Sequence, residues 1–215
     1  MTSIAIIDYG MGNLHSIAKA LEHVADKERV VVSNRREQIL SADRVVFPGV
    51  GAIRDCMAEL KKTGLGEVVV QAAASRPVLG VCLGMQALLS KSEENQGTEC
   101  LDILPGTVKH FPRDMTSADN GGRHKIPHMG WNQVQQVRAH AMWEKIPTDS
   151  RFYFVHSYYA SPDSVDDVAA TTPYGIEFTS VIARDNIFAV QFHPEKSQHV
   201  GLQLLENFVG WNGEP

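Results

Sequence analysis

A cysteine between two glycines has the surroundings that best suit nucleophilic chemistry in this sequence. Cys82 follows the apolar run 78–81, and Gly80 and Gly84 flank it in the pattern G-x-C-x-G. A strand that turns sharply into a helix needs glycines there, because larger side chains would collide. Such a turn places the thiol near a helix N-terminus, where free N–H groups and the helix dipole favour a thiolate. The N–H of Leu83 is then a candidate donor to an oxyanion on an attacked carbonyl.

A second candidate group lies far downstream, at His193-Pro194-Glu195. Proline keeps the residue before it extended, and in an extended segment side chains two positions apart project to the same side. Glu195 can therefore orient His193 while the other ring nitrogen takes a proton from a thiol. Together with Cys82 this predicts a Cys-His-Glu triad for covalent acyl transfer. The alternatives are a buried, inert cysteine and a surface turn without a role.

Apolar runs that alternate with helix-period segments must position these groups. The order predicts an α/β fold: a doubly wound, mostly parallel sheet with helices on both faces, in a single domain over residues 1–215. Sites in such sheets lie at the carboxyl ends of the strands, where Gly10, Gly49 and Cys82 fall. The segment 113–125 is polar and predicts a surface excursion. The expected strands include 3–8, 29–32, 44–47, 78–82, 152–155, 168–171, 180–184 and 187–190, and the expected helices include 14–21, 52–60, 65–74, 83–89 and 202–209.

Composition excludes several other classes of protein. The formal net charge of −5 and the lack of a clustered basic run argue against nucleic-acid binding. No apolar run reaches the length of a membrane span, and the N-terminus lacks the features of a signal peptide. Three cysteines form neither a disulfide framework nor a C-x-x-C motif, so we expect a reducing cytoplasm. His124 and His128 have helical ligand spacing, but Pro127 prevents that helix, so we expect no metal.

Several sequence blocks resemble a known family. The segments 80–86 and 191–195 resemble the class I (triad) glutamine amidotransferases, which have a flavodoxin-like fold. Five further blocks are similar to the glutaminase subunits of imidazole glycerol phosphate synthases, and they run from the first strand to the last helix. The segment 113–125 departs from that pattern, which leaves its role open. The five blocks are DYGMGN (8–13), PGVG (48–51), PHMGWN (127–132), HSY (156–158) and PEKS (194–197).

The resemblance implies a reaction on L-glutamine without a cofactor or a metal. Cys82 would attack the side-chain amide, His193 would protonate the departing ammonia, and water would hydrolyse the thioester. Val50, in the glycine loop, would provide a second oxyanion donor beside Leu83. The family's substrate contacts carry over to Gln86, Glu94, Ser157 and Tyr158.

The resemblance also implies a partner. Ammonia would pass to a (β/α)₈ cyclase subunit in a heterodimer that makes imidazole glycerol phosphate in histidine biosynthesis. The interface and gating positions would be Asn13, Met129, Trp131 and Lys196. Core packing is the alternative for Met129 and Trp131. We hypothesise that the flexible peptide at Val50 turns its N–H toward the site only when the liganded cyclase binds.

Three other functions stay open at this point. The first alternative is a glutaminase subunit of a pyridoxal phosphate or anthranilate synthase. The DYGMGN and PHMGWN blocks disfavour it. The second is a stand-alone cysteine hydrolase, which would not depend on glutamine. A non-catalytic subunit that retains the fold is the third, and the intact Cys82, His193 and Glu195 disfavour it.

Overall fold

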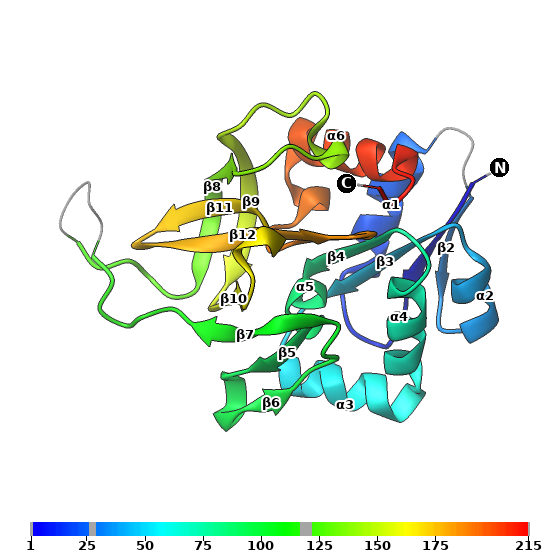
Figure 1. Ribbon diagram of the computed structural model, residues 1–215, viewed down its shortest axis with the longest axis horizontal. Coiled ribbons are helices and arrows are strands. Elements are labelled where there is room, and N and C mark those ends of the chain that lie inside the picture. The colour runs from blue at the N-terminus through cyan, green and yellow to red at the C-terminus, as the bar shows by residue number, and fades with distance from the viewer. Residues whose placement is uncertain (1, 26–28, 117–121, 215) are drawn as a thin grey trace.

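Five parallel strands form one half of the sheet in a computed structural model that describes residues 2–25, 29–116 and 122–214 (Figure 1). Their order is β2-β1-β3-β4-β13, which is the flavodoxin-like order. The pairing is parallel throughout this group, as the alternation of strands and helices predicts. The bounds are β1 (Ser3–Ile7), β2 (Arg29–Ser33), β3 (Arg44–Gly49), β4 (Val78–Cys82) and β13 (Ile187–Val190).

Helices cover both faces of these strands, as predicted. Alternate residues of β1 divide between the faces: Ile4 and Ile6 pack in one hydrophobic cluster, and Ala5 and Ile7 in the other. The first cluster holds α1 (Leu14–Val24) and α6 (Gln198–Gly210), which contact each other. Figure 1 shows them on the opposite side of the sheet from α3 and α4. The second cluster holds α2 (Arg36–Ser41), α3 (Ile53–Thr63) and α4 (Leu65–Ala73).

Beyond β13 the sheet continues mainly with antiparallel pairs. Short turns join β11 to β12 at Gly175, which has a φ of +70°, and β12 to β13 at residues 185–186, and turns this short cannot make the crossover that parallel strands need. The strand bounds in this part are β5 (Leu89–Ser92), β6 (Thr98–Glu99), β7 (Leu104–His110), β8 (His128–Gln136), β9 (Ser150–His156), β10 (Tyr158–Pro162), β11 (Val168–Tyr174) and β12 (Ile176–Arg184).

The structure differs from the sequence prediction in the helix after Cys82, and it describes only part of the predicted surface excursion 113–125. The helix after Cys82 is the short α5 (Leu83–Ala87), and Leu89 already starts β5, so the expected helix 83–89 is two residues too long. Leu89 pairs with Leu104, which explains why an apolar stretch that suits a helix ends as a strand. Within the expected excursion 113–125, Thr116 pairs with Arg123, and residues 117–121 lie outside the described residues. In the ranges that the structure describes, no helix is long and apolar enough to cross a membrane.

Candidate active site

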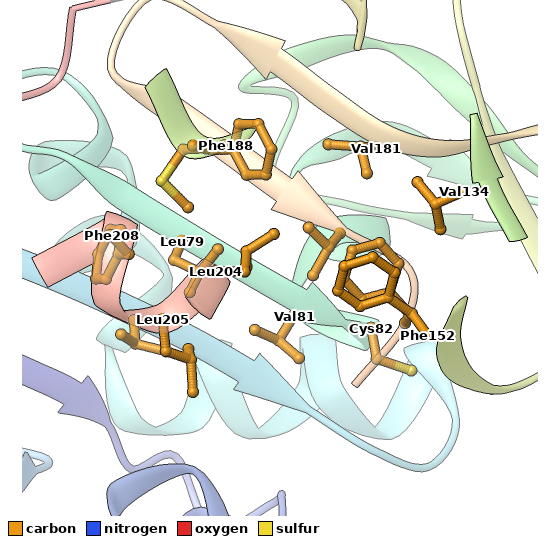
Figure 2. Close-up of a cluster of buried hydrophobic side chains, with 14 of the residues drawn as sticks. Leu79, Val81, Cys82, Val134, Phe152, Val181, Phe188, Leu204, Leu205 and Phe208 are labelled. Atoms are coloured by element: carbon orange, nitrogen blue, oxygen red, sulfur yellow. The ribbon is translucent and has the colours of Figure 1, made fainter. Parts of the chain in front are cut away.

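The glycine pattern around Cys82 makes a sharp turn between β4 and α5, as predicted. Cys82 has a φ of 54° and a ψ of −108°, a backbone conformation that is strained for a residue with a side chain. A Cβ on Gly84 would lie 1.9 Å from the carbonyl oxygen of Phe47, and one on Gly80 would lie 3.0 Å from the Cβ of Ala189. In Figure 2, Leu79 leads along β4 to Cys82, whose sulfur points away from the core leucines of α6. The turn therefore requires a glycine at position 84, and Gly80 allows the close approach of β4 and β13.

His193 lies three residues after the end of β13, the strand beside β4, and its Nδ1 lies 2.9 Å from Oε1 of Glu195. Both side chains are nearly buried, with 2% and 4% of their surface exposed. The predicted contact is present, but the predicted extended segment is wrong. His193 itself is extended, whereas Pro194–Lys196 forms a 3₁₀ turn, because proline fits the first position of a helical turn. The turn brings the carboxylate back under the imidazole.

Cys82 and His193 line the same cavity, although 111 positions separate them in the sequence. The cavity has a volume of about 310 Å³. A larger cavity of about 510 Å³ lies between α3 and α4 and holds none of the predicted site residues. Six further predicted site residues line the smaller cavity: Val50, Leu83, Gln86, Glu94, Ser157 and Tyr158. Glu195 and the four predicted interface residues do not line it.

The electrostatic surroundings favour a protonated His193. Burial lowers the pKa of this imidazole, but its interactions with Cys82 and Glu195 together raise the pKa to about 10. Nε2 of His193 is buried, and no hydrogen bond to it is found within the described residues. This arrangement can supply a proton to a group that leaves from the sulfur side of the cavity.

The two predicted oxyanion donors, Leu83 and Val50, line the same cavity as Cys82. Leu83 is the first residue of α5, and Val50, which is 38% exposed, follows β3. The backbone before Val50 is closely packed: a Cβ on Gly49 would lie 2.5 Å from the Tyr9 hydroxyl, which donates a 3.0 Å hydrogen bond to the Pro48 carbonyl. The glycine at position 49 is thus required by this close approach.

Glu94 and Gln86 are held from the backbone of neighbouring elements. The Glu94 carboxylate accepts a 3.1 Å hydrogen bond from the N–H of Ile53, the first residue of α3. The Gln86 amide donates to the Tyr158 carbonyl at 3.0 Å. These bonds give both side chains a fixed place in the cavity wall.

The four predicted interface residues lie outside the cavity. Met129 and Trp131 are 62% and 42% exposed on β8, which excludes core packing for both. Lys196 is exposed and is the last residue of the 3₁₀ turn that follows His193. Asn13 is exposed and has a structural role of its own, because its side chain accepts a hydrogen bond from Ser16 N–H and caps α1.

Three buried polar residues, Gln191, His128 and His156, form hydrogen bonds that local sequence patterns do not predict. Gln191 donates to the Cys82 sulfur at 3.7 Å, and His128 and His156 form a hydrogen-bonded pair. All three residues stand inside blocks that carry the family resemblance, which was the available signal. Their partners are distant in sequence, so spacing alone does not reveal them. His128, considered above with His124 for its metal-ligand spacing, forms its hydrogen bond with His156 on the adjacent strand.

The family model for class-I glutamine amidotransferases matches residues 5–210 of this sequence. The chain therefore belongs to the class I glutamine amidotransferase family, in agreement with its fold and its Cys-His-Glu arrangement.

Curated relatives define the branch within that class. The chain is 62% identical over 213 residues to "Imidazole glycerol phosphate synthase subunit HisH" of Nitrosococcus oceani, with 99% of each chain covered. It is 58% identical to the protein of the same name of Methylococcus capsulatus, with 98% of this chain and 97% of the relative covered. Within its class the chain thus belongs to the HisH subunit family, as the resemblance predicted.

Solved structures show the same fold at low identity. A putative GMP synthase subunit from Thermoplasma acidophilum matches with a TM-score of 0.68 at 20% identity, covering 98% of this chain and 93% of that chain. PurLQS from Thermotoga maritima matches with a TM-score of 0.69 at 12% identity, covering 97% and 98%. These likenesses confirm the fold class.

Proposed function

We propose that this chain hydrolyses L-glutamine to glutamate and ammonia, with Cys82 as nucleophile, His193 as acid and base, and Glu195 as the group that orients His193. The observation that carries this proposal is the shared cavity of Cys82 and His193, with Glu195 2.9 Å from the imidazole. One amidotransferase domain spans residues 1–215. No cofactor takes part.

The reaction follows from the charges of these groups. The protonated His193 favours a thiolate at Cys82, and the thiolate attacks the carbonyl carbon of the side-chain amide. The N–H groups of Leu83 and Val50 stabilise the oxyanion. His193 gives its proton to the departing ammonia, and the acyl group stays on sulfur as a thioester. His193 then takes a proton from water, the resulting hydroxide attacks the thioester, and the sulfur leaves as the thiolate while glutamate is released, which restores the starting state.

Substrate binding falls to four side chains around this cavity. Gln86 and Glu94 present polar oxygen atoms, and a carboxylate suits the ammonium group of an amino acid. Ser157 follows β9 and Tyr158 starts β10, and both line the same cavity. The volume of about 310 Å³ is near the lower end for small-ligand sites, which suits one amino acid.

We further propose a cyclase subunit with a (β/α)₈ fold as the partner, in a cytoplasmic heterodimer that makes imidazole glycerol phosphate. The names of the relatives support a role in a synthase complex. The exposed Met129 and Trp131 support a contact surface that includes Asn13 and Lys196, since large exposed apolar side chains are typical of interfaces. The three free cysteines fit a reducing compartment.

The test measures ammonia release from L-glutamine by the chain alone, with the cyclase, and with the cyclase bound to its ribonucleotide substrate. We expect slow release alone and a rise of about 10²–10³-fold in the liganded complex, if the Val50 N–H joins the oxyanion site only there. Equal rates in all three samples would remove the gating hypothesis. No release in any sample would contradict the proposed function, and activity with a different synthase partner would replace the proposed pathway.

A further inference from the structure

Two buried histidines face each other on adjacent strands beside the cavity. His128 starts β8 and His156 ends β9, and they are direct partners in the antiparallel ladder. Nδ1 of His128 lies 2.9 Å from Nε2 of His156. The His128 ring stacks between Phe154 and Tyr174, with ring centroids 4.8 and 3.9 Å away. The pair is thus rigidly packed and 3% and 6% exposed.

The hydrogen bonds allow only one proton arrangement in this pair. Nδ1 of His156 lies 2.7 Å from the Tyr158 carbonyl, and a carbonyl only accepts, so Nδ1 carries the proton. Burial lowers the pKa of His156 to about 3 and that of His128 to about 4, so both rings are neutral at neutral pH. Nε2 of His156 is then an acceptor, and Nδ1 of His128 donates to it. Nε2 of His128 in turn accepts from the Asn132 amide at 3.3 Å.

The Tyr158 carbonyl joins this pair to the nucleophile through two amides. It accepts a second hydrogen bond, at 3.0 Å, from the Gln86 amide nitrogen. The same nitrogen donates to the Gln191 oxygen at 2.9 Å, and the Gln191 nitrogen donates to the Cys82 sulfur at 3.7 Å. Gln86 and Gln191 are 4% and 0% exposed. The donor and the acceptor of each hydrogen bond from His156 to Cys82 are therefore fixed.

We propose that His128, His156 and Gln191 are positioning residues that hold the Cys82 sulfur and the Tyr158 backbone in the geometry for attack, a role that rests on the proposed function. Gln191 acts directly, because an N–H that donates to sulfur stabilises and aims a thiolate. The histidines act through the Tyr158 carbonyl, which fixes the Gln86 amide and hence the acceptor of Gln191. The contacts cannot relay a proton from the histidines to Cys82, because the carbonyl accepts from both sides.

The test uses variants that keep or remove one donor. His156→Asn keeps an amide N–H near the position of Nδ1, whereas His156→Gln places its amide near the position of Nε2. Gln191→Met keeps the length of the side chain and removes the donor to sulfur. His140→Asn is the control, because this half-buried ring accepts from Met142 N–H and lines no part of the cavity. Thermal unfolding verifies that each variant folds.

Two readouts separate positioning from general damage. The first is the alkylation rate of Cys82 by iodoacetamide, followed on its peptide by mass spectrometry, which needs no glutamine. The second is the split between KM for glutamine and kcat in the complex with the cyclase. We expect Gln191→Met to slow alkylation by about 10-fold or more. We expect His156→Gln to raise KM by about 10-fold or more, and His156→Asn to stay within about threefold of the wild type.

The outcomes decide the proposal separately from the proposed function. Equal behaviour of folded His156→Asn and His156→Gln would overturn the tautomer argument, and an unchanged alkylation rate in Gln191→Met would overturn the role of Gln191. If the variants at position 156 do not fold, the alkylation rate of Gln191→Met decides. A wild-type chain that alkylates rapidly at Cys82 but releases no ammonia would contradict the proposed function alone.

Discussion

At the scale of single residues, the chemistry of this chain depends on three groups whose protons are set by their neighbours. His193 has a raised pKa because Cys82 and Glu195 favour its charged form more strongly than burial disfavours it. His128 and His156 have lowered pKa values because burial disfavours their charged forms, and the hydrogen bond to the Tyr158 carbonyl only partly offsets this for His156. Charged and neutral imidazoles thus lie around the same cavity, each suited to a different role.

Replacing Glu195 by glutamine should lower the pKa of His193 from about 10 toward its ordinary value, because the opposite charge is lost. The proposed acid form of His193 would then disappear at a lower pH, so activity should fall earlier as the pH rises. NMR titration of the imidazole checks the pKa, and the pH profile of ammonia release checks its consequence. We expect kcat to fall by about 10²–10⁴-fold. Glu37→Gln, on the exposed start of α2, is the control, and an unchanged His193 titration would contradict the argument.

The three cysteines should differ sharply in reactivity toward a glutamine-analogue electrophile. Burial raises the pKa of Cys56 to about 11 and that of Cys100 to about 12, so both stay thiols at neutral pH. Cys82 opens to the cavity beside a charged imidazole. We expect a single adduct on Cys82 by mass spectrometry, and none in Cys82→Ala. Labelling of Cys56 or Cys100 at a similar rate would show that the site does not select Cys82.

At the scale of elements, α6 and the 3₁₀ turn after His193 meet without room for a side chain. A Cβ on Gly201 would lie 1.9 Å from the Pro194 carbonyl oxygen and 2.8 Å from the Ser197 Cβ. Ser197 also links this turn to β9, because it accepts from Tyr153 N–H and donates to the His193 carbonyl. The place of His193 and Glu195 therefore depends on how closely α6 packs.

Gly201→Ala should destabilise the protein, although alanine ordinarily stabilises a helix interior by up to about 1 kcal/mol over glycine. The collision with Pro194 reverses the sign, and we expect a loss of about 2 kcal/mol or more together with reduced activity. Gly210→Ala on the same helix has open space and is the matched control. Urea unfolding of both variants measures the effect. A Gly201→Ala protein as stable as Gly210→Ala would refute the close contact.

At the scale of the whole molecule, the proposed function involves the edge of the parallel sheet and the exposed face of β8. The carboxyl ends of β3, β4 and β13 meet at one edge of the parallel sheet, and the antiparallel part adds β8, β9 and β10 beside it. The cavity therefore lies between both parts of the sheet. Trp131 and Met129 extend outward from the second part.

Trp131→Ala should weaken binding of the proposed cyclase by about 10-fold or more, because exposed tryptophans often dominate interface energy. Its stability alone should change little, since 42% of the side chain is exposed. Isothermal titration calorimetry with the cyclase measures the affinity. Val165→Ala, at a side chain that is 82% exposed in another part of the surface, is the control. Equal losses of affinity in both variants would speak against this face as the interface.

Acid should lower the free energy of unfolding through the buried histidine pair. The folded pKa of His128 is about 4, below the unfolded value of about 6.5, so the unfolded state takes up its proton first as the pH falls. The neutral His128 therefore contributes about 3 kcal/mol to the free energy of unfolding. This contribution is complete above about pH 6.5 and is lost as the pH falls toward about 4. Urea unfolding at pH 7, 5.5 and 4.5 measures the loss, which should be smaller in His128→Asn. The control is His199→Asn, at an exposed histidine, which should lose as much stability in acid as the wild type. If His199→Asn and His128→Asn showed equally small losses, the buried pair would not be the cause.

Much of this protein could be predicted from local sequence. The alternation of apolar runs and helical segments predicts the parallel strands, because burial on both faces leaves a continuous apolar run. The glycines at 80 and 84 predict the turn at Cys82, and Pro194 predicts a constrained His193. The family blocks predict which residues meet around the cavity.

Other features depend on contacts between distant segments, and only the tertiary structure decided them. Leu89 forms a strand because it pairs with Leu104, against a helical local pattern. Glu195 reaches His193 through a 3₁₀ turn that α6 packs against, rather than along an extended segment. The contacts from His128 to Cys82 join four strands (β8, β9, β10 and β4) and one helix (α5), so their proton arrangement has no local signature. Local sequence determines which conformations are available, and long-range packing and hydrogen bonds select among them.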